Sequence, residues 1–332
     1  MKKSQQNMIQ GPGRFEYYLI QLDELFVKAS KTENPALFLY QNDARTKLFM
    51  LEGLSKLYAG LHDKKRFKYA LEYFKSLEDM IGAVDYYDSF AKDFLNDPIM
   101  PSTIRLFVES KRDENLKAIN EILVKKKWIN NDAVRTKKIK RKIKSAAWKI
   151  PEKEVKLIKE FYKNEIEKIN QFYKDTGAEF TDIELQVHSV RRKLRWLSIY
   201  PQALQGCVQF ADNGTETPEL SKYLTPEIVN SPFNIMPKAG NNQFFFLIER
   251  NYFLALSFVI SALGKLKDKG LRILVIAEAV QNTQFVTEEI AMERALALNG
   301  GNADGLKDSL KKAKEICEPF FAENNLGKLI VQ

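Results

Sequence analysis

The chain has few of the residues that mark several large classes of protein. Only two cysteines, Cys207 and Cys317, occur in 332 residues. This excludes a disulfide framework, and we expect two buried thiols rather than a bridge. The two histidines, His62 and His188, are too few for a usual zinc site. The 11 prolines and 15 glycines exclude collagen-like and low-complexity chains.

Long hydrophobic runs are also missing. The longest stretches without a charged residue, 196–211 and 251–264, are shorter than the roughly 20 apolar residues that span a bilayer. The N-terminal 18 residues begin with two lysines but contain no apolar core, so they do not resemble a signal peptide. We therefore expect a cytoplasmic protein with no membrane partner.

Familiar catalytic and cofactor signatures are absent too. The sequence has no G-x-x-x-x-G-K-[ST] loop, no G-x-S-x-G elbow and no glycine-rich strand-to-helix fingerprint. Glu184 and His188 are four residues apart, but a di-iron bundle needs a Glu-x-x-His pair from each of two helices. Glu288 and Glu289 suit the negative charge preferred at a helix N-terminus. We expect no enzyme, no cofactor and no metal site.

Helix-forming residues dominate what is present, and apolar residues recur at helical spacing. The sequence therefore predicts an all-α protein. The segment 271–280, LRILVIAEAV, also fits a strand, but no neighbouring strand is predicted, so a buried helix is favoured. The predicted helices cover 14–30, 35–58, 67–95, 103–127, 132–148, 151–175, 183–200, 243–267 and 271–280, followed by one capped by Thr287 and one after the turn at 300–305.

Positive charge is concentrated in residues 125–149. This segment holds eleven basic residues and one acid, and the rest of the chain is close to neutral. Such a local field suits phosphate-bearing polymers, although a solvated helix face has the same composition. Trp128 and Trp148 flank the segment and either stack nucleic-acid bases or pack the segment onto the protein. The basic patch consists of Lys137, Lys138, Lys140, Arg141 and Lys144.

Two segments align without gaps at an offset of 146 residues. Residues 42–48, NDARTKL, match 188–194, HSVRRKL, and apolar pairs continue the match. Because positions i and i+3 share a helix face, each segment presents a polar residue and an arginine together. The matched cations are Arg45 with Arg191 and Lys47 with Lys193.

Each of these segments is followed by a second, weaker match. The first contains Gly82 and the second contains Gly264. The longer spacing in the second half is explained by a proline-rich stretch of turn-forming residues, 211–242, which we expect to be an irregular insertion.

This arrangement resembles the CHAD (conserved histidine α-helical domain) family over roughly residues 35–280. Members consist of two related helical bundles, each beginning with an H-x-x-R helix and later carrying an L-G-x-x-[RN]-D-type turn. The resemblance implies binding of inorganic polyphosphate in a basic central channel, without catalysis. This chain differs from the pattern at Asn42, in place of the histidine, and at Asp85, in place of a basic residue three positions after Gly82.

The two opening helices would face each other across a central groove if the repeats pack about a pseudo-two-fold axis. Arginines there can clamp phosphates bidentately, and His188 can donate to a phosphate oxygen. A packed histidine and a solvated helix face are the alternatives. Nucleic-acid binding and docking of an acidic protein are the alternative functions. The predicted polyanion site comprises Arg45, Lys47, His188, Arg191, Arg192, Lys193 and Arg195.

The predicted domain organisation follows from the repeat, and oligomeric state is not predicted. A flexible leader covers 1–13, the first pseudo-repeated bundle of antiparallel helices covers 14–130, and a basic connecting helix covers 131–150. The second bundle covers 151–332 and contains the loop insertion 211–242.

Overall fold

The structure is a computed structural model that describes residues 10–129, 134–211, 217–300 and 305–331. Within these ranges the chain forms thirteen α-helices and two four-residue strands, which confirms the all-α prediction. None of the described helices combines the length and apolar character needed to cross a bilayer.

The first part of the chain forms six helices. They are α1 (Pro12–Ala29), α2 (Pro35–Gln41), α3 (Ala44–Leu61), α4 (Lys64–Leu95), α5 (Ser102–Lys125) and α6 (Val134–Lys144). The predicted leader ends earlier than expected, because Pro12 opens α1 at a position where its missing N–H costs nothing. Residues 1–9 of that leader lie outside the described chain.

The second part begins with α7 (Pro151–Asp175) and a π-helical turn, η1 (Ile183–His188), that runs directly into α8 (Ser189–Ala203). Strands β1 (Val208–Ala211) and β2 (Phe246–Glu249) enclose three short turns. The chain ends with three long or medium helices. In order after β1 the elements are α9 (Pro218–Ser221), α10 (Pro226–Val229), η2 (Pro232–Asn234), β2, α11 (Arg250–Gln284), α12 (Glu288–Leu298) and α13 (Gly305–Ala322).

The helix predicted over 35–58 is wrong as a single element. It is broken between α2 and α3 by Asn42 and Asp43, and Asp43 has a left-handed backbone with φ 58°. The Asp43 carboxylate accepts a hydrogen bond from Lys47 at 2.5 Å and another from Thr46. These local bonds stabilise a turn that neither proline nor glycine marks in the sequence.

The helices predicted over 243–267 and 271–280 are also wrong as separate elements. Residues from Arg250 to Gln284 form the single helix α11, which confirms the helical interpretation of LRILVIAEAV. The residues before it form β2, which pairs in parallel with β1 from Val208↔Phe246 to Ala211↔Glu249. The predicted insertion therefore lies between two paired strands, except for Ala211, which belongs to β1.

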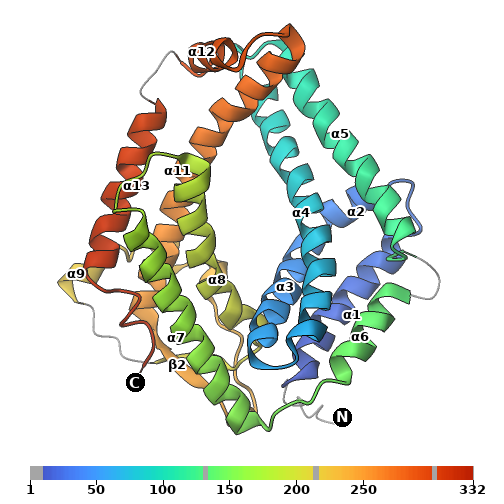
Figure 1. The fold of residues 1–332 in the computed structure, drawn as a ribbon, viewed down its shortest axis with the longest axis vertical. Coiled ribbons are helices and arrows are strands. Elements are labelled where there is room, and N and C mark those ends of the chain that lie inside the picture. Colours follow the sequence, from blue (N-terminus) through green and yellow to red (C-terminus); the bar gives the residue numbers. More distant parts are fainter. Residues whose placement is uncertain (1–9, 130–133, 212–216, 301–304, 332) are drawn as a thin grey trace.

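Helices α3 and α8 pack side by side, with α4 against α3 and α11 against α8 (Figure 1). The long helices α4 and α11, of 32 and 35 residues, converge near the start of α5 at the top of the view. A main core joins buried residues of both halves, and a second core lies where α4, α5, α11 and α12 meet. The opening helices of the two matched segments are thus neighbours.

The basic helix α6 packs against α1 and α4 through the buried residues Ile139 and Ile143, so it lies on the flank of the first half (Figure 1). Trp128 is 2% exposed, and Trp148 packs against Tyr58 with ring centroids 5.0 Å apart. Both tryptophans therefore pack the basic segment onto the protein, and neither is placed to stack a base. Both cysteines are buried free thiols, as predicted.

Candidate anion-binding site

The side chain of Arg45, a residue of α3, extends to α4. Its Nε–H donates to Glu78 Oε1 at 2.8 Å, and an Nη1 hydrogen donates to Asp85 Oδ2 at 2.5 Å. Glu78, Gly82 and Asp85 follow one face of α4 at i, i+4 and i+7. A β-carbon built on Gly82 would lie 2.8 Å from Arg45 Nη2, so the bare backbone at Gly82 is what admits the guanidinium.

Arg191 makes the corresponding contact on α11. Its Nε–H donates to the backbone carbonyl of Ile260 at 3.1 Å, and a β-carbon on Gly264 would lie 3.0 Å from the same nitrogen. The arginine and glycine that align in the two segments therefore touch each other in both halves. The difference lies in the partner, which is a backbone carbonyl here and a pair of carboxylates at Arg45.

Arg195 completes a cluster of three guanidinium groups. Its Cζ lies 4.5 Å from the ring centroid of Phe49, and Arg45 Cζ lies 5.7 Å from the same ring. The Arg195 guanidinium makes no hydrogen bond or ion pair with any residue that the structure describes, although the backbone carbonyl of Arg195 accepts a hydrogen bond from the Ser198 hydroxyl. Burial, with the positive charges of Arg191 and Arg45, lowers the pKa of Arg195 to about 10. We call Arg45, Arg191 and Arg195 the arginine cluster.

Glu52 adds a carboxyl group beside the acidic side of this cluster. It is buried on α3, and its Oε2 atom has no hydrogen-bond partner among the residues that the structure describes. Burial, together with the nearby Glu78 carboxylate, raises the pKa of Glu52 to about 7. Burial also raises the pKa of Glu78, and the hydrogen bond from Arg45 opposes that shift. Glu52 and Glu78 are therefore easier to protonate than ordinary surface carboxyls.

Three of the predicted site residues lie elsewhere. Lys47 pairs with Asp43 on its own helix, Lys193 lies over the ring of Phe172 at 4.5 Å, and Arg192 is exposed. Two residues along a helix correspond to about 200° of rotation, so Lys47 and Lys193 point away from the face that carries Arg45 and Arg191. Neither lysine therefore joins Arg45 and Arg191, and the predicted part of both lysines in polyanion binding stays a prediction.

His188 also bonds within its own segment. Its Nδ1 lies 2.6 Å from Glu184 Oε1, and the side chain is 28% exposed. The two residues belong to η1, whose first turn is capped by the Asp182 side chain through the N–H of Leu185. The imidazole therefore pairs with a carboxylate of its own segment. The sequence had suggested a phosphate donor or a packed histidine, and this pairing is neither.

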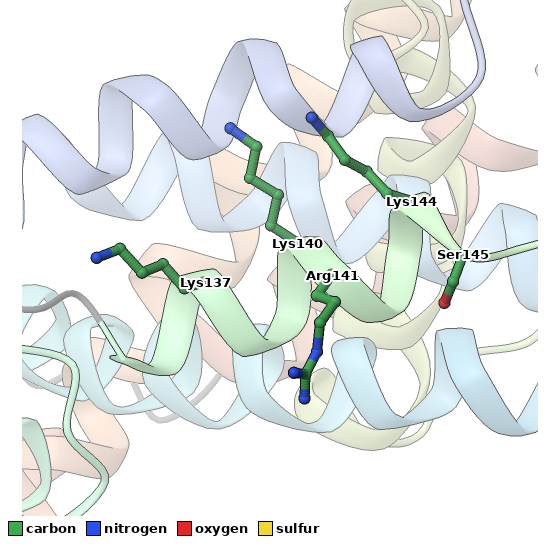
Figure 2. A pocket seen from close by; sticks show the side chains of 5 residues that line it. All are labelled: Lys137, Lys140, Arg141, Lys144 and Ser145. Atoms are coloured by element: carbon green, nitrogen blue, oxygen red, sulfur yellow. The ribbon is translucent and has the colours of Figure 1, made fainter.

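The predicted basic patch forms a separate surface on α6. Figure 2 shows Lys137, Lys140 and Lys144 leaving one side of the helix and Arg141 leaving the other, around a shallow hollow that Ser145 also lines. Lys140 and Lys144 share one acid, Glu16 of α1, with Lys144 Nζ at 3.4 Å. Lys137, Lys138 and Arg141 make no ion pair with a described residue, so cations exceed acids here.

The described chain contains few groupings of side chains that suggest a chemical role other than the binding of charged ligands. No group of three or more His, Cys, Asp or Glu residues is placed there to hold a metal ion. The chain matches no protein-family model, no curated protein and no solved structure. The resemblance to the CHAD family therefore stays a prediction that rests on the residues themselves, above all on the two arginine–glycine pairs.

Proposed function

We propose that this is a non-catalytic, cytoplasmic polyanion-binding protein whose ligand is inorganic polyphosphate. The observation that carries the proposal is the arginine cluster, and within it Arg195, a largely buried cation that makes no ion pair with a carboxylate of the described residues. A buried cation among like charges is costly unless an opposite charge joins it. A bound phosphate would supply that charge.

The chemistry of the cluster favours phosphate over other anions. A guanidinium presents a planar fork of donors that matches phosphate oxygens, and charge-assisted hydrogen bonds of this kind are the strong ones. The three groups come from α3 and α8, so a chain with repeated charges can contact both helices at once. The α6 patch offers such a polymer a second, less specific surface.

Nucleic acid is the weaker alternative for this surface. Base stacking would need exposed aromatic rings beside the cations. Trp128 is buried, and Trp148 is packed among Phe15, Tyr58 and Phe67. An acidic protein partner on α6 remains the other alternative, and competition experiments separate the three ligands.

The sharpest test replaces Arg195 with Gln. Because the Arg195 guanidinium bonds to no described residue, the variant should fold at least as stably as the wild type, while its affinity for polyphosphate falls about tenfold. Affinity would be measured by calorimetric titration at two salt concentrations, with duplex and single-stranded nucleic acid as competitors. The salt dependence, as log K against log salt, should lose about 0.7 for each phosphate contact removed.

Lys311→Gln on α13 is the matched control, since it removes one positive charge from a side chain that is 76% exposed. It should leave affinity unchanged. Equal affinity of the wild type and Arg195→Gln would show that the arginine cluster is not the site. Preferential displacement of polyphosphate by nucleic acid would favour the alternative ligand.

A further inference from the structure

The two halves of the arginine cluster are not equally available to a ligand. The guanidinium of Arg45 is bonded to two carboxylates, Glu78 and Asp85, whereas that of Arg191 is bonded to a backbone carbonyl and that of Arg195 to no described residue. The anion-binding capacity of the first half is therefore already used by the protein itself.

We infer that the Asp85 carboxylate is an internal competitor that occupies Arg45 in place of a phosphate and so sets the affinity of the site. The inference rests on the proposed function. In the unliganded state Asp85 neutralises Arg45. When a phosphate oxygen takes the Nη1 hydrogen bond, Asp85 is released to water, and Arg45 joins Arg191 and Arg195 on the ligand.

Asp85 is the displaceable partner and Glu78 is the fixed one. The Asp85 side chain is 49% exposed, whereas that of Glu78 is 6% exposed. Within the described chain, the second hydrogen bond to Asp85 is a long one, from the Tyr40 hydroxyl at 3.5 Å, and this hydroxyl lies closer to Asp88, at 2.7 Å. An exposed carboxylate loses little when it exchanges one partner for water, but a buried carboxylate would be left without solvation.

The second half shows what the site looks like without this competitor. Relative to the glycine, Ile260 of α11 stands where Glu78 stands on α4, and Lys267 stands where Asp85 stands. Lys267 pairs with Asp268 at 2.9 Å, and Arg191 forms no ion pair with any carboxylate in the described part of the chain. Two side chains thus separate the two arginines: Glu78 and Asp85 pair with Arg45 on α4, whereas the equivalent positions on α11 hold Ile260 and Lys267.

The test is a double-mutant cycle between Asp85 and Arg45, with tripolyphosphate as the titrant at fixed pH and salt. Asp85→Asn should bind tripolyphosphate about tenfold more tightly than the wild type, because one charge-assisted bond no longer has to be broken. In the Arg45→Gln background the same substitution should have no effect. Asp79→Asn is the matched control, since Asp79 is an exposed acid on α4 that pairs with Lys75 instead.

A gain in affinity that is specific to Asp85 and depends on Arg45 supports the inference, even where wild-type binding is too weak to detect. Equal gains for Asp85→Asn and Asp79→Asn overturn it, because the effect is then one of net charge. Equal gains combined with weaker binding by Arg195→Gln than by the wild type would leave the proposed function standing and remove only the role of Asp85 as a competitor. Absence of binding by the wild type and by Asp85→Asn overturns both proposals.

Discussion

Glu52 is the residue whose environment most changes its chemistry. Its carboxyl group lies among Glu78, Asp79, Lys75 and Lys56, and one of its oxygens is buried without a hydrogen bond. Its pKa of about 7 lies above the ordinary value, so the native state binds a proton that the unfolded chain has already lost. Stability is therefore highest below about pH 4.5 for this group and decreases as the pH rises to about 7.

Glu52→Gln should remove this dependence. At pH 8 the variant should be more stable than the wild type by about 1–3 kcal/mol, because the cost of ionising a buried carboxyl is gone. At pH 4.5 the two proteins should unfold together. Thermal unfolding at several pH values measures the difference, and a constant offset across the range would contradict the assigned cause.

Gly82 and Gly264 determine how close an arginine can come to each long helix. Alanine at either position would place a methyl group within 2.8–3.0 Å of a guanidinium nitrogen, so the guanidinium must move away. Alanine also stabilises a helix by about 1 kcal/mol relative to glycine. Displacement of the guanidinium lowers stability and the helix propensity of alanine raises it, so the two effects offset each other in the free energy of unfolding. Only the displacement affects binding.

We therefore expect Gly82→Ala and Gly264→Ala to lower polyphosphate affinity by about 3- to 10-fold, with stability changed by less than about 1 kcal/mol. Titration and chemical denaturation of the same samples measure the two quantities. Gly305→Ala is the control, because the nearest atom to its β-carbon lies 4.0 Å away. Unchanged affinity in both variants would argue against guanidinium placement as the basis of binding.

At the scale of elements, the sequence predicted the helices that carry long apolar stripes and missed features that arise elsewhere. The break at Asp43 depends on side-chain hydrogen bonds within one turn, and the β1–β2 pair joins two four-residue segments that are far apart in the chain. Apolar periodicity detects neither. The aligned segments predicted that Arg45, Arg191 and Arg195 would approach one another, and in the structure they do.

The acids of the site were harder to foresee. Glu78 and Asp85 sit 33 and 40 residues beyond Arg45 on a different helix. Nothing in the H-x-x-R-like segment indicates a carboxylate partner. The i, i+4, i+7 spacing around Gly82 is the signal that could have found them, once α4 and α3 were known to be neighbours. The helical period alone could have shown that Lys47 and Lys193 leave their helices on a different side from Arg45 and Arg191.

For the molecule as a whole, Arg272 joins the two halves at the end away from β1 and β2. Its Nε–H donates to Asp93 Oδ2 at 2.8 Å, a second nitrogen bonds to Asp97, and its guanidinium lies over Phe94 at 5.3 Å. These contacts connect α11 to the end of α4 and the turn before α5. They lie at the edge of the second core, in which Phe94 and Ile273 are buried.

Arg272→Met should loosen this junction selectively. Loss of the contacts to Asp93 and Asp97 should cost about 1–3 kcal/mol, since it leaves two acids without their partner. Hydrogen exchange should become faster in the last turns of α4 and α11 and in α12, while α1 to α3 keep their protection. Uniform acceleration over the whole chain would show that the junction has no separate stability.

The second core also has a consequence for the order in which the chain folds. It joins the end of α4 to the later part of α11, and these segments are separated by more than half of the chain. The two most extensive helix pairings in the first half, α3 with α4 and α4 with α5, are between sequence neighbours. Loop-closure entropy delays contacts of high contact order, so this junction should form after the local hairpins. The arginine cluster, which needs α8 beside α3, is then assembled only in the late, slow phase of refolding.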